Sequence, residues 1–239
     1  KIFLLLNGDN HPAVATSYSY IGQIYFAQND YSKALDYFKK SLKLDLSFFG
    51  ENHPSVASGY YNIGYVYFAQ GDYSKALEYF EEVLKIRLSV YGENHSRVAS
   101  VYNDIGEIYS VQGDDFKALD YFKKSLKIVL SVYGENHSQV SSIYDHIGEI
   151  YFAQKDYSKT LYYFEESLKI RLSLFGENHP EVALSYYSIG SLYIIQGDKS
   201  KALNYYEKSL KIRLSVYGEN HPSVSYTHLR AHETEADLV

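Results

Sequence analysis

Carboxylate and imidazole side chains gather at one point inside the chain. Asp145, His146 and Glu149 form its most compact set of ligand-type residues, and such groups can hold a divalent cation. Asp145 and Glu149 are four residues apart and share one helix face, whereas His146 would point about 100° away from Asp145 on the same helix. The three groups do not converge on one ion, so we predict no metal site and no cofactor.

A second chemical candidate is a histidine that recurs every 42 residues. These side chains fall one in each successive unit, too far apart to bind one metal ion together, and we expect each to cap or pack at the start of a helix. A further set near the C-terminal end, Thr227, His228, His232 and Glu233, is also not expected to bind metal. The recurring histidines are His11, His53, His95, His137, His179 and His221.

Catalytic chemistry is not indicated elsewhere in the chain. The sequence has no cysteine, so a thiolate nucleophile and a Cys-based zinc site are excluded. It has no GxSxG motif, and its glycines occur singly, so no phosphate-cradling loop is predicted. A catalytic site has to depart locally from a repeat, and this sequence has few departures. We therefore predict no catalytic residues and no enzymatic activity.

The amino-acid composition limits the classes of molecule that the chain is expected to bind. The chain has 29 acidic and 23 basic side chains among 239 residues and a formal net charge of −6, which disfavours binding to nucleic acid because phosphate contacts need a basic surface. No apolar stretch reaches the roughly 18 residues of a membrane span. The absence of cysteine is compatible with a reducing compartment, and we expect a cytoplasmic protein.

The elements that carry these residues follow the 42-residue period. The segment GENH, or a close variant, precedes each unit, and five complete units follow one another in register. We assign repeats to residues 11–52, 53–94, 95–136, 137–178 and 179–220.

The two ends of the chain can be aligned with the 42-residue repeats. Residues 1–10 align with the end of a repeat, and we interpret them as the remnant of a truncated one. Residues 221–224 start a sixth repeat. Residues 225–239 leave the register and are similar to translated adapter sequence, so we expect a non-native tail.

Each unit reads as two helices. In the second unit, Pro54 suits a first helical position, Gly71 and Asp72 suit a helix stop and the cap of the next helix, and the second helix ends at Gly92. Gly64, in the middle of the first helix, implies that the partner helix passes too close for a side chain. Apolar residues fall on one face of the first helix at i, i+4, i+7, i+8 and i+11, namely Val56, Tyr60, Ile63, Gly64 and Tyr67.

These positions carry a family resemblance. Tyr60, Ile63, Gly64, Tyr67, Ala76 and Phe80 reproduce the tetratricopeptide repeat signature, with Tyr in the usual Trp position and Leu88 where the family commonly has Pro. The unit is longer than the usual length of about 34 residues and resembles the repeats of kinesin light chains. The resemblance implies an all-α fold, a right-handed superhelical solenoid of antiparallel helix pairs.

In such a solenoid the first helices line a concave groove. The face of each first helix opposite the core is therefore expected to bind a peptide. The predicted groove residues are Tyr20, Gln23, Tyr61, Asn62, Tyr65, Phe68, Asn103, Asp104, Glu107, Asp145, His146, Glu149, Phe152 and Tyr187.

The charge of this face suggests the chemistry of the bound segment. The first helices place no Lys or Arg on it, while Asp104, Glu107, Asp145 and Glu149 gather in the two middle units. We expect a basic or aromatic-containing segment along units two to five, since aromatic side chains are favoured anchors. The alternative interpretation is that these acidic side chains lie on an exposed helix face and contact only solvent.

The sequence thus favours a protein-interaction module or adaptor, and the likeness to kinesin light chains implies cargo recognition. The alternative is the regulatory or substrate-docking arm of a larger enzyme or signalling protein. Self-association through uncapped end faces is a further expectation.

Overall fold

The computed structural model describes residues 11–218 together with residues 221, 222, 227 and 230. The chain divides into two compact units, residues 1–128 and 129–239. The segments predicted as a truncated repeat, 1–10, and as a non-native tail, 225–239 except Thr227 and Arg230, lie outside the described residues. In the described part, no helix combines the length and apolar character needed to cross a bilayer.

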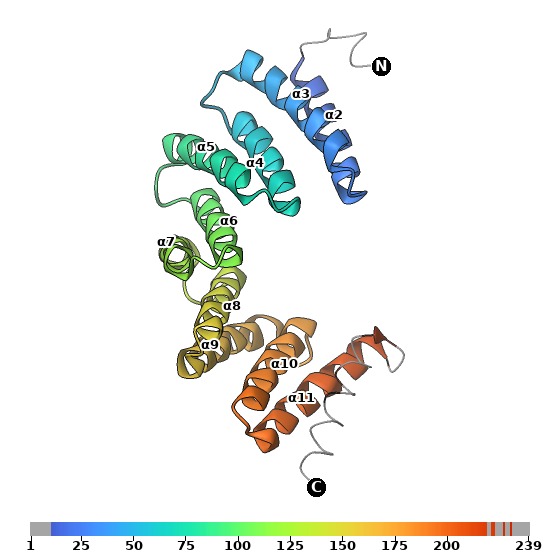
Figure 1. The fold of residues 1–239 in the computed structure, drawn as a ribbon, viewed down its shortest axis with the longest axis vertical. Helices are drawn as coiled ribbons and strands as arrows, with labels where there is room; N and C mark the ends of the chain where they lie inside the picture. Colours follow the sequence, from blue (N-terminus) through green and yellow to red (C-terminus); the bar gives the residue numbers. More distant parts are fainter. Residues whose placement is uncertain (1–10, 219–220, 223–226, 228–229, 231–239) are drawn as a thin grey trace. The chain divides into compact units, whose positions relative to one another are not determined.

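Every regular element in the described residues is an α-helix, and short and long helices alternate along the chain (Figure 1). The first helices of the repeats have 16 residues and are α2 (Pro12–Ala27), α4 (Pro54–Ala69), α6 (Ser96–Val111), α8 (Ser138–Ala153) and α10 (Pro180–Ile195). The second helices have 19 residues and are α3 (Tyr31–Phe49), α5 (Tyr73–Tyr91), α7 (Asp115–Tyr133), α9 (Tyr157–Phe175) and α11 (Lys199–Tyr217). The predicted all-α fold of helix pairs is confirmed.

A histidine starts each first helix. The Nδ1 atom of His53 accepts a hydrogen bond from the Ser55 amide at 3.1 Å, which satisfies one of the amide groups left unpaired at a helix start. Its ring also stacks on Phe49, at the end of the preceding helix, with 4.0 Å between ring centroids. The same cap forms at 3.1 to 3.2 Å at the other described first helices. The predicted capping role is confirmed for the histidines that precede α2, α4, α6, α8 and α10.

The turn between the two helices of a repeat is also as expected. Gly71 has a φ of 78°, a left-handed conformation that glycine adopts without steric cost. Asp72 then caps α5 by accepting the Lys75 amide at 3.3 Å. Because these few residues reverse the chain, α4 and α5 pack against each other as an antiparallel pair.

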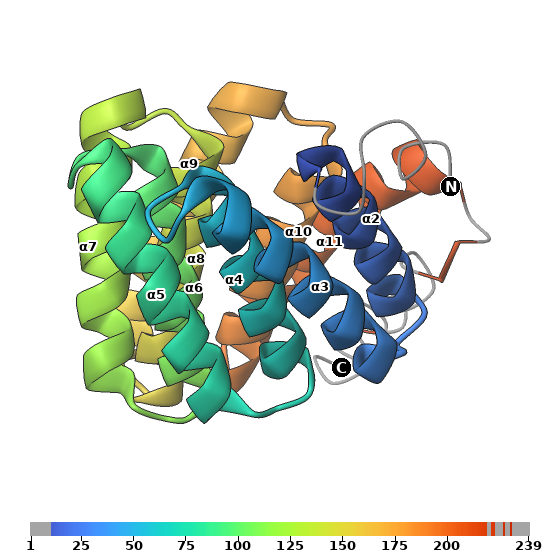
Figure 2. The ribbon, with the colours of Figure 1, turned by 90° about the horizontal axis from the view of Figure 1, so that it is seen from above.

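The helices pack in chain order within each unit. In residues 11–128, α2 contacts α3, α4 contacts α5, and α3 and α5 contact the first helix of the following repeat; Figures 1 and 2 show α2 beside α3 and α4 beside α5. In residues 129–239, α8 contacts α9, α10 contacts α11, and α9 contacts α10. In residues 11–128, Val56 and Ile63 of α4 and Phe80 of α5 are almost fully buried. The inward face read from the sequence is thus the core face.

Most of the mid-helix glycines face an aromatic ring of the partner helix, whereas the nearest atoms to Gly64 are the Cβ atom of Tyr79 and the Ala76 carbonyl oxygen. A Cβ atom at Gly22 would lie 2.7 Å from the ring of Phe38, and one at Gly106 would lie 2.8 Å from the ring of Phe122. Real Cβ atoms do not approach other atoms this closely, so the predicted close approach is confirmed. At Gly22 and Gly106 an aromatic side chain occupies the space and packs against the bare backbone of the first helix.

Ion pairs form along the outer face of the second helices. Asp120 and Lys124 pair at 2.7 Å, and Lys85 pairs with Glu82 at 3.4 Å. Exposed pairs of this kind each contribute about 0.2–1 kcal/mol, so they support a solvated surface and little more.

Candidate functional site

The first-helix face of residues 11–128 carries two adjoining hollows. One has a volume of about 330 Å³ and is polar, and it lies where α2, α3 and α4 meet. The other has a volume of about 140 Å³ and is lined mainly by aromatic rings. Gln23 and Asn62 line both, so the two hollows are neighbours. The predicted groove residues that line one or both are Tyr20, Gln23, Tyr61, Asn62 and Tyr65.

The aromatic hollow is built from α2, α3 and α4. Tyr65 is 44% exposed, and its ring centroid lies 5.5 Å from that of Phe26 and 6.3 Å from that of Tyr61. Phe68, also predicted in the groove, packs on the same ring at 6.2 Å. Phe38 forms part of the lining. Partly exposed aromatic rings held in fixed positions can accept an apolar side chain at low entropic cost.

Arg87 brings a cation to this face from the second helix α5. Its Cζ atom lies 5.3 Å from the ring centroid of Tyr61. Its Nη1 atom donates to the Arg97 carbonyl at 2.8 Å and to the Ser100 hydroxyl at 2.9 Å. The guanidinium is therefore held between α4 and α6. Burial, together with Asp104, raises the pKa of Tyr61 well above its usual value.

Asp104 is more enclosed than the sequence suggested. Its Oδ2 atom is buried and has no hydrogen-bond partner among the described residues. Burial raises the pKa of Asp104 to about 7, and neighbouring Glu107 adds to the rise, while Tyr61 and Arg87 oppose it. Asn103 donates to Glu107 at 2.6 Å. This part of the predicted acidic groove is a packed polar cluster.

Asp145 is also engaged within its own unit. Its Oδ2 atom lies 2.7 Å from Nη2 of Arg171, a side chain only 8% exposed on α9. The same guanidinium contacts Glu181 at 3.3 Å and donates to the Ser185 hydroxyl at 2.7 Å. Burial raises the pKa of Asp145 even though Arg171 favours its charged form.

No Lys or Arg is found among the predicted groove residues of the first helices. Arg87, Arg171 and Arg213 reach this face from second helices, which the prediction did not consider; Arg213 lies 5.4 Å from the ring centroid of Tyr187. Asp104 and Asp145 each have an arginine of the chain beside them. The sequence reasoning missed these arginines because it considered only the first helices.

The remaining predicted residues lie in residues 129–239. Glu149 and Phe152 are exposed, and Phe152 contacts Tyr157 with 6.1 Å between ring centroids. His146 and Tyr187 are half-buried. They stay candidates for the binding face of their own unit.

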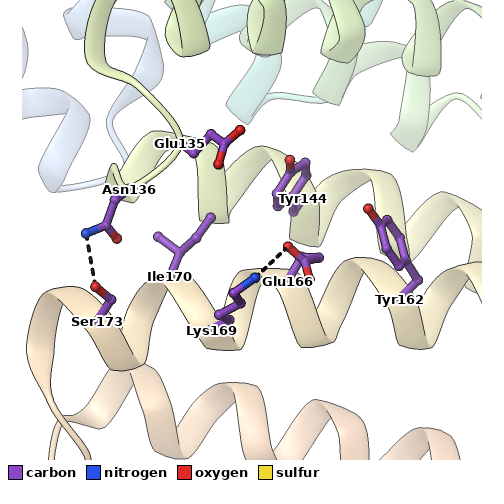
Figure 3. A pocket seen from close by; sticks show the side chains of 8 residues that line it. All are labelled: Glu135, Asn136, Tyr144, Tyr162, Glu166, Lys169, Ile170 and Ser173. Carbon is purple, nitrogen blue, oxygen red and sulfur yellow. Dashed lines mark hydrogen bonds and ion pairs between the residues drawn. The ribbon is translucent and has the colours of Figure 1, made fainter.

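A third hollow, of about 360 Å³, lies beside α8 and α9 and was not predicted (Figure 3). Its charged and polar groups contact one another: Lys169 lies 3.8 Å from Glu166, and Asn136 donates to Ser173 at 3.0 Å. Figure 3 shows Tyr144 and Tyr162 bordering the same space. It holds none of the predicted groove residues.

Comparison with known proteins agrees with the repeat geometry. A family model described as tetratricopeptide repeat matches residues 1–47, 44–89, 55–131, 97–173 and 139–215. The chain belongs to the tetratricopeptide repeat family. No curated protein matches it.

Solved structures share the tetratricopeptide repeat fold. BtubC (BKLC) from P. vanneervenii superposes with a TM-score of 0.77 at 23% identity, over 88% of this chain and 84% of that one. A Podosopora anserina putative kinesin light chain with nearly identical TPR-like repeats gives a TM-score of 0.73 at 16% identity, over 86% and 97%. The Rap conjugation gene regulator of plasmid pLS20, in complex with the Phr* peptide, gives 0.68 at 17% identity, over 92% and 58%. The predicted likeness to kinesin-light-chain-type repeats is confirmed at the level of the fold.

Proposed function

We propose that this tetratricopeptide repeat chain is a protein-interaction module that holds an extended segment of a partner on the first-helix face of α2 and α4. The observation that carries the proposal is the pair of adjoining hollows, one polar and one aromatic, between α2, α3 and α4. Such a pair offers an apolar anchor beside hydrogen-bonding groups, the combination that recurs in peptide grooves.

The segment is proposed to be basic or to contain aromatic or apolar residues. The net charge of −6 favours a positively charged partner through long-range attraction. The aromatic hollow beside Phe26, Tyr61 and Tyr65 takes an apolar side chain. The described complex of the Rap regulator with a peptide supports peptide binding on this fold.

The broader role follows from the same surface. A binding face without proposed catalytic groups suits an adaptor rather than an enzyme. A second role, as the docking arm of a larger regulator, is favoured by the Rap neighbour, of which this chain covers 58%. Cytoplasmic location and self-association, the latter measurable by sedimentation at rising concentration, stay predictions.

A selection experiment tests the proposal. The immobilised chain is used to select from a displayed library of short random peptides, and the affinities of the enriched peptides are measured by calorimetry. Tyr65→Ala should weaken binding about tenfold or more, because losing a central aromatic contact costs about 1.4 kcal/mol or more. Phe116→Ala, at a side chain 84% exposed on α7, should bind as the wild type does. Failure to enrich any peptide, or equal binding by Tyr65→Ala, would remove the proposal.

A further inference from the structure

One position of the repeat has opposite charges in different repeats. Counting by 42 residues, it is occupied by Asp45, Arg87, Val129, Arg171 and Arg213. It lies on the second helix, in the part that contacts the first helix of the same repeat and of the next one. The first repeat is the only one with an acid there.

At Arg87 and Arg171 the guanidinium group fills a polar space between consecutive first helices. Arg87 donates to the Arg97 carbonyl and the Ser100 hydroxyl at 2.8 and 2.9 Å. Arg171 donates to Ser185 at 2.7 Å and pairs with Asp145. The fold therefore contains a place that a guanidinium group fits, surrounded by oxygen acceptors.

In the first repeat the corresponding space is an open hollow, and the residue at this position is an acid instead of an arginine. Asp45 is 8% exposed and lines the polar hollow of about 330 Å³. Within the described part of the chain, no hydrogen bond or ion pair is formed by its carboxylate. Burial raises the pKa of Asp45, and His53 opposes the rise. A carboxylate this buried gains strongly from a cation that reaches it.

The acceptors that surround the arginines elsewhere have counterparts in this hollow. Ser55 and Ser58 line it at the positions that Arg97 and Ser100 occupy one repeat later. Ser19 stands where the next repeat has Tyr61, so the space is not filled by a ring. Ser19 accepts from Asn62 at 3.2 Å. The hollow thus holds hydroxyl and carboxylate oxygens, and none of the described residues that line it is basic.

We propose that this hollow binds the guanidinium group of an arginine in the partner segment, with Asp45 as its counter-ion. The inference rests on the proposed function and names the chemistry of one anchor. Because Gln23 and Asn62 border both hollows, one extended peptide reaches both. Side chains two residues apart lie on the same side of an extended chain, about 7 Å apart, so an apolar residue two positions from the arginine enters the aromatic hollow.

The test compares variants of the 239-residue chain in the same peptide selection. Wild type should enrich arginine at one position and an apolar residue two positions away. Asp45→Asn should lose the arginine preference and keep the apolar one, and Asp45→Arg should disfavour arginine. Asp36→Asn, which removes an exposed carboxylate from the same helix, should select as the wild type does. Arginine is native at this position in three other repeats, so Asp45→Arg is expected to fold, and circular dichroism checks both variants.

Affinity of a selected peptide gives the second readout. Replacing its arginine by glutamine should weaken binding to wild type at least tenfold and leave binding to Asp45→Asn nearly unchanged. Unchanged arginine enrichment with Asp45→Asn would overturn the guanidinium site while leaving the peptide-binding module intact. Equal enrichment of lysine and arginine would overturn the choice of guanidinium. Enrichment of no peptide by the wild type would overturn the proposed function and this site with it.

Discussion

The buried carboxyl group of Asp104 makes the stability of this protein depend on pH. Burial raises its pKa from 3.8 to about 7, so between these values the folded chain keeps a proton that the unfolded chain releases. A group whose pKa rises on folding contributes its full stability below the unfolded pKa and loses it as the pH rises through the folded pKa. The free energy of unfolding should therefore fall between about pH 4 and pH 7.

The size of this effect follows from the pKa difference. At about 1.36 kcal/mol per pH unit, a rise from 3.8 to about 7 corresponds to about 4 kcal/mol at high pH. Asp104→Asn removes the charge and keeps the shape. We expect it to raise the free energy of unfolding by about 2–4 kcal/mol at about pH 8 and to change it by less than about 1 kcal/mol near pH 4.

Urea unfolding followed by circular dichroism across this pH range measures the difference. The matched control is Asp120→Asn, which removes an exposed carboxylate paired with Lys124 and should change stability by about 1 kcal/mol or less at any pH. A stability gain that does not vary with pH would refute the reasoning. So would an NMR titration of the Asp104 carboxyl carbon with a midpoint near pH 4.

Other predictions concern packing, caps and a buried ion pair. Gly22→Ala should destabilise the fold by about 1–3 kcal/mol in urea unfolding, because the new methyl group meets the ring of Phe38; a gain, as helix propensity alone would give, would contradict this. His95→Ala should cost about 1–2 kcal/mol through loss of its cap, and His95→Asn should restore part of it. Arg171→Met should cost about 3 kcal/mol because it leaves Asp145 without its partner, and adding Asp145→Asn should recover most of that. Equal losses in the single and double variants would count against the ion pair.

The sequence predicted the fold because each local signal repeats. Helix boundaries are marked by residues whose chemistry favours a helix start or stop: His53 and Pro54 at the start of α4, and the glycine and aspartate of the turn before α5. The structure has its helix boundaries at these residues. Gly64 marked the close approach of the second helix, whose Tyr79 Cβ atom and Ala76 carbonyl oxygen lie nearest to it. At Gly22 and Gly106 an aromatic ring fills the space instead, which the sequence could not show because rotamers are set by packing with several neighbours at once.

The binding face was harder to predict than the fold. Of the predicted groove residues, Tyr61 and Tyr65 line a hollow, and their role in binding stays a prediction. The burial of Asp104 could not be read from its own helix, because α5 contributes Arg87 to the same space. Asp45 did carry a visible signal, since among the five complete repeats it is the one acid at a position that is otherwise arginine or valine. This signal is found only when the second helices of the repeats are aligned with one another, in addition to the first helices.

The central claim is that the first-helix face of α2 and α4 holds a partner segment. Backbone amide chemical shifts of the full chain, recorded by NMR while a selected peptide is added, test it most directly. The account predicts the largest changes in residues 16–26 of α2 and 55–65 of α4, around the two hollows. Changes centred instead on the hollow at Tyr144, Tyr162 and Glu166, with α2 and α4 unaffected, would contradict it.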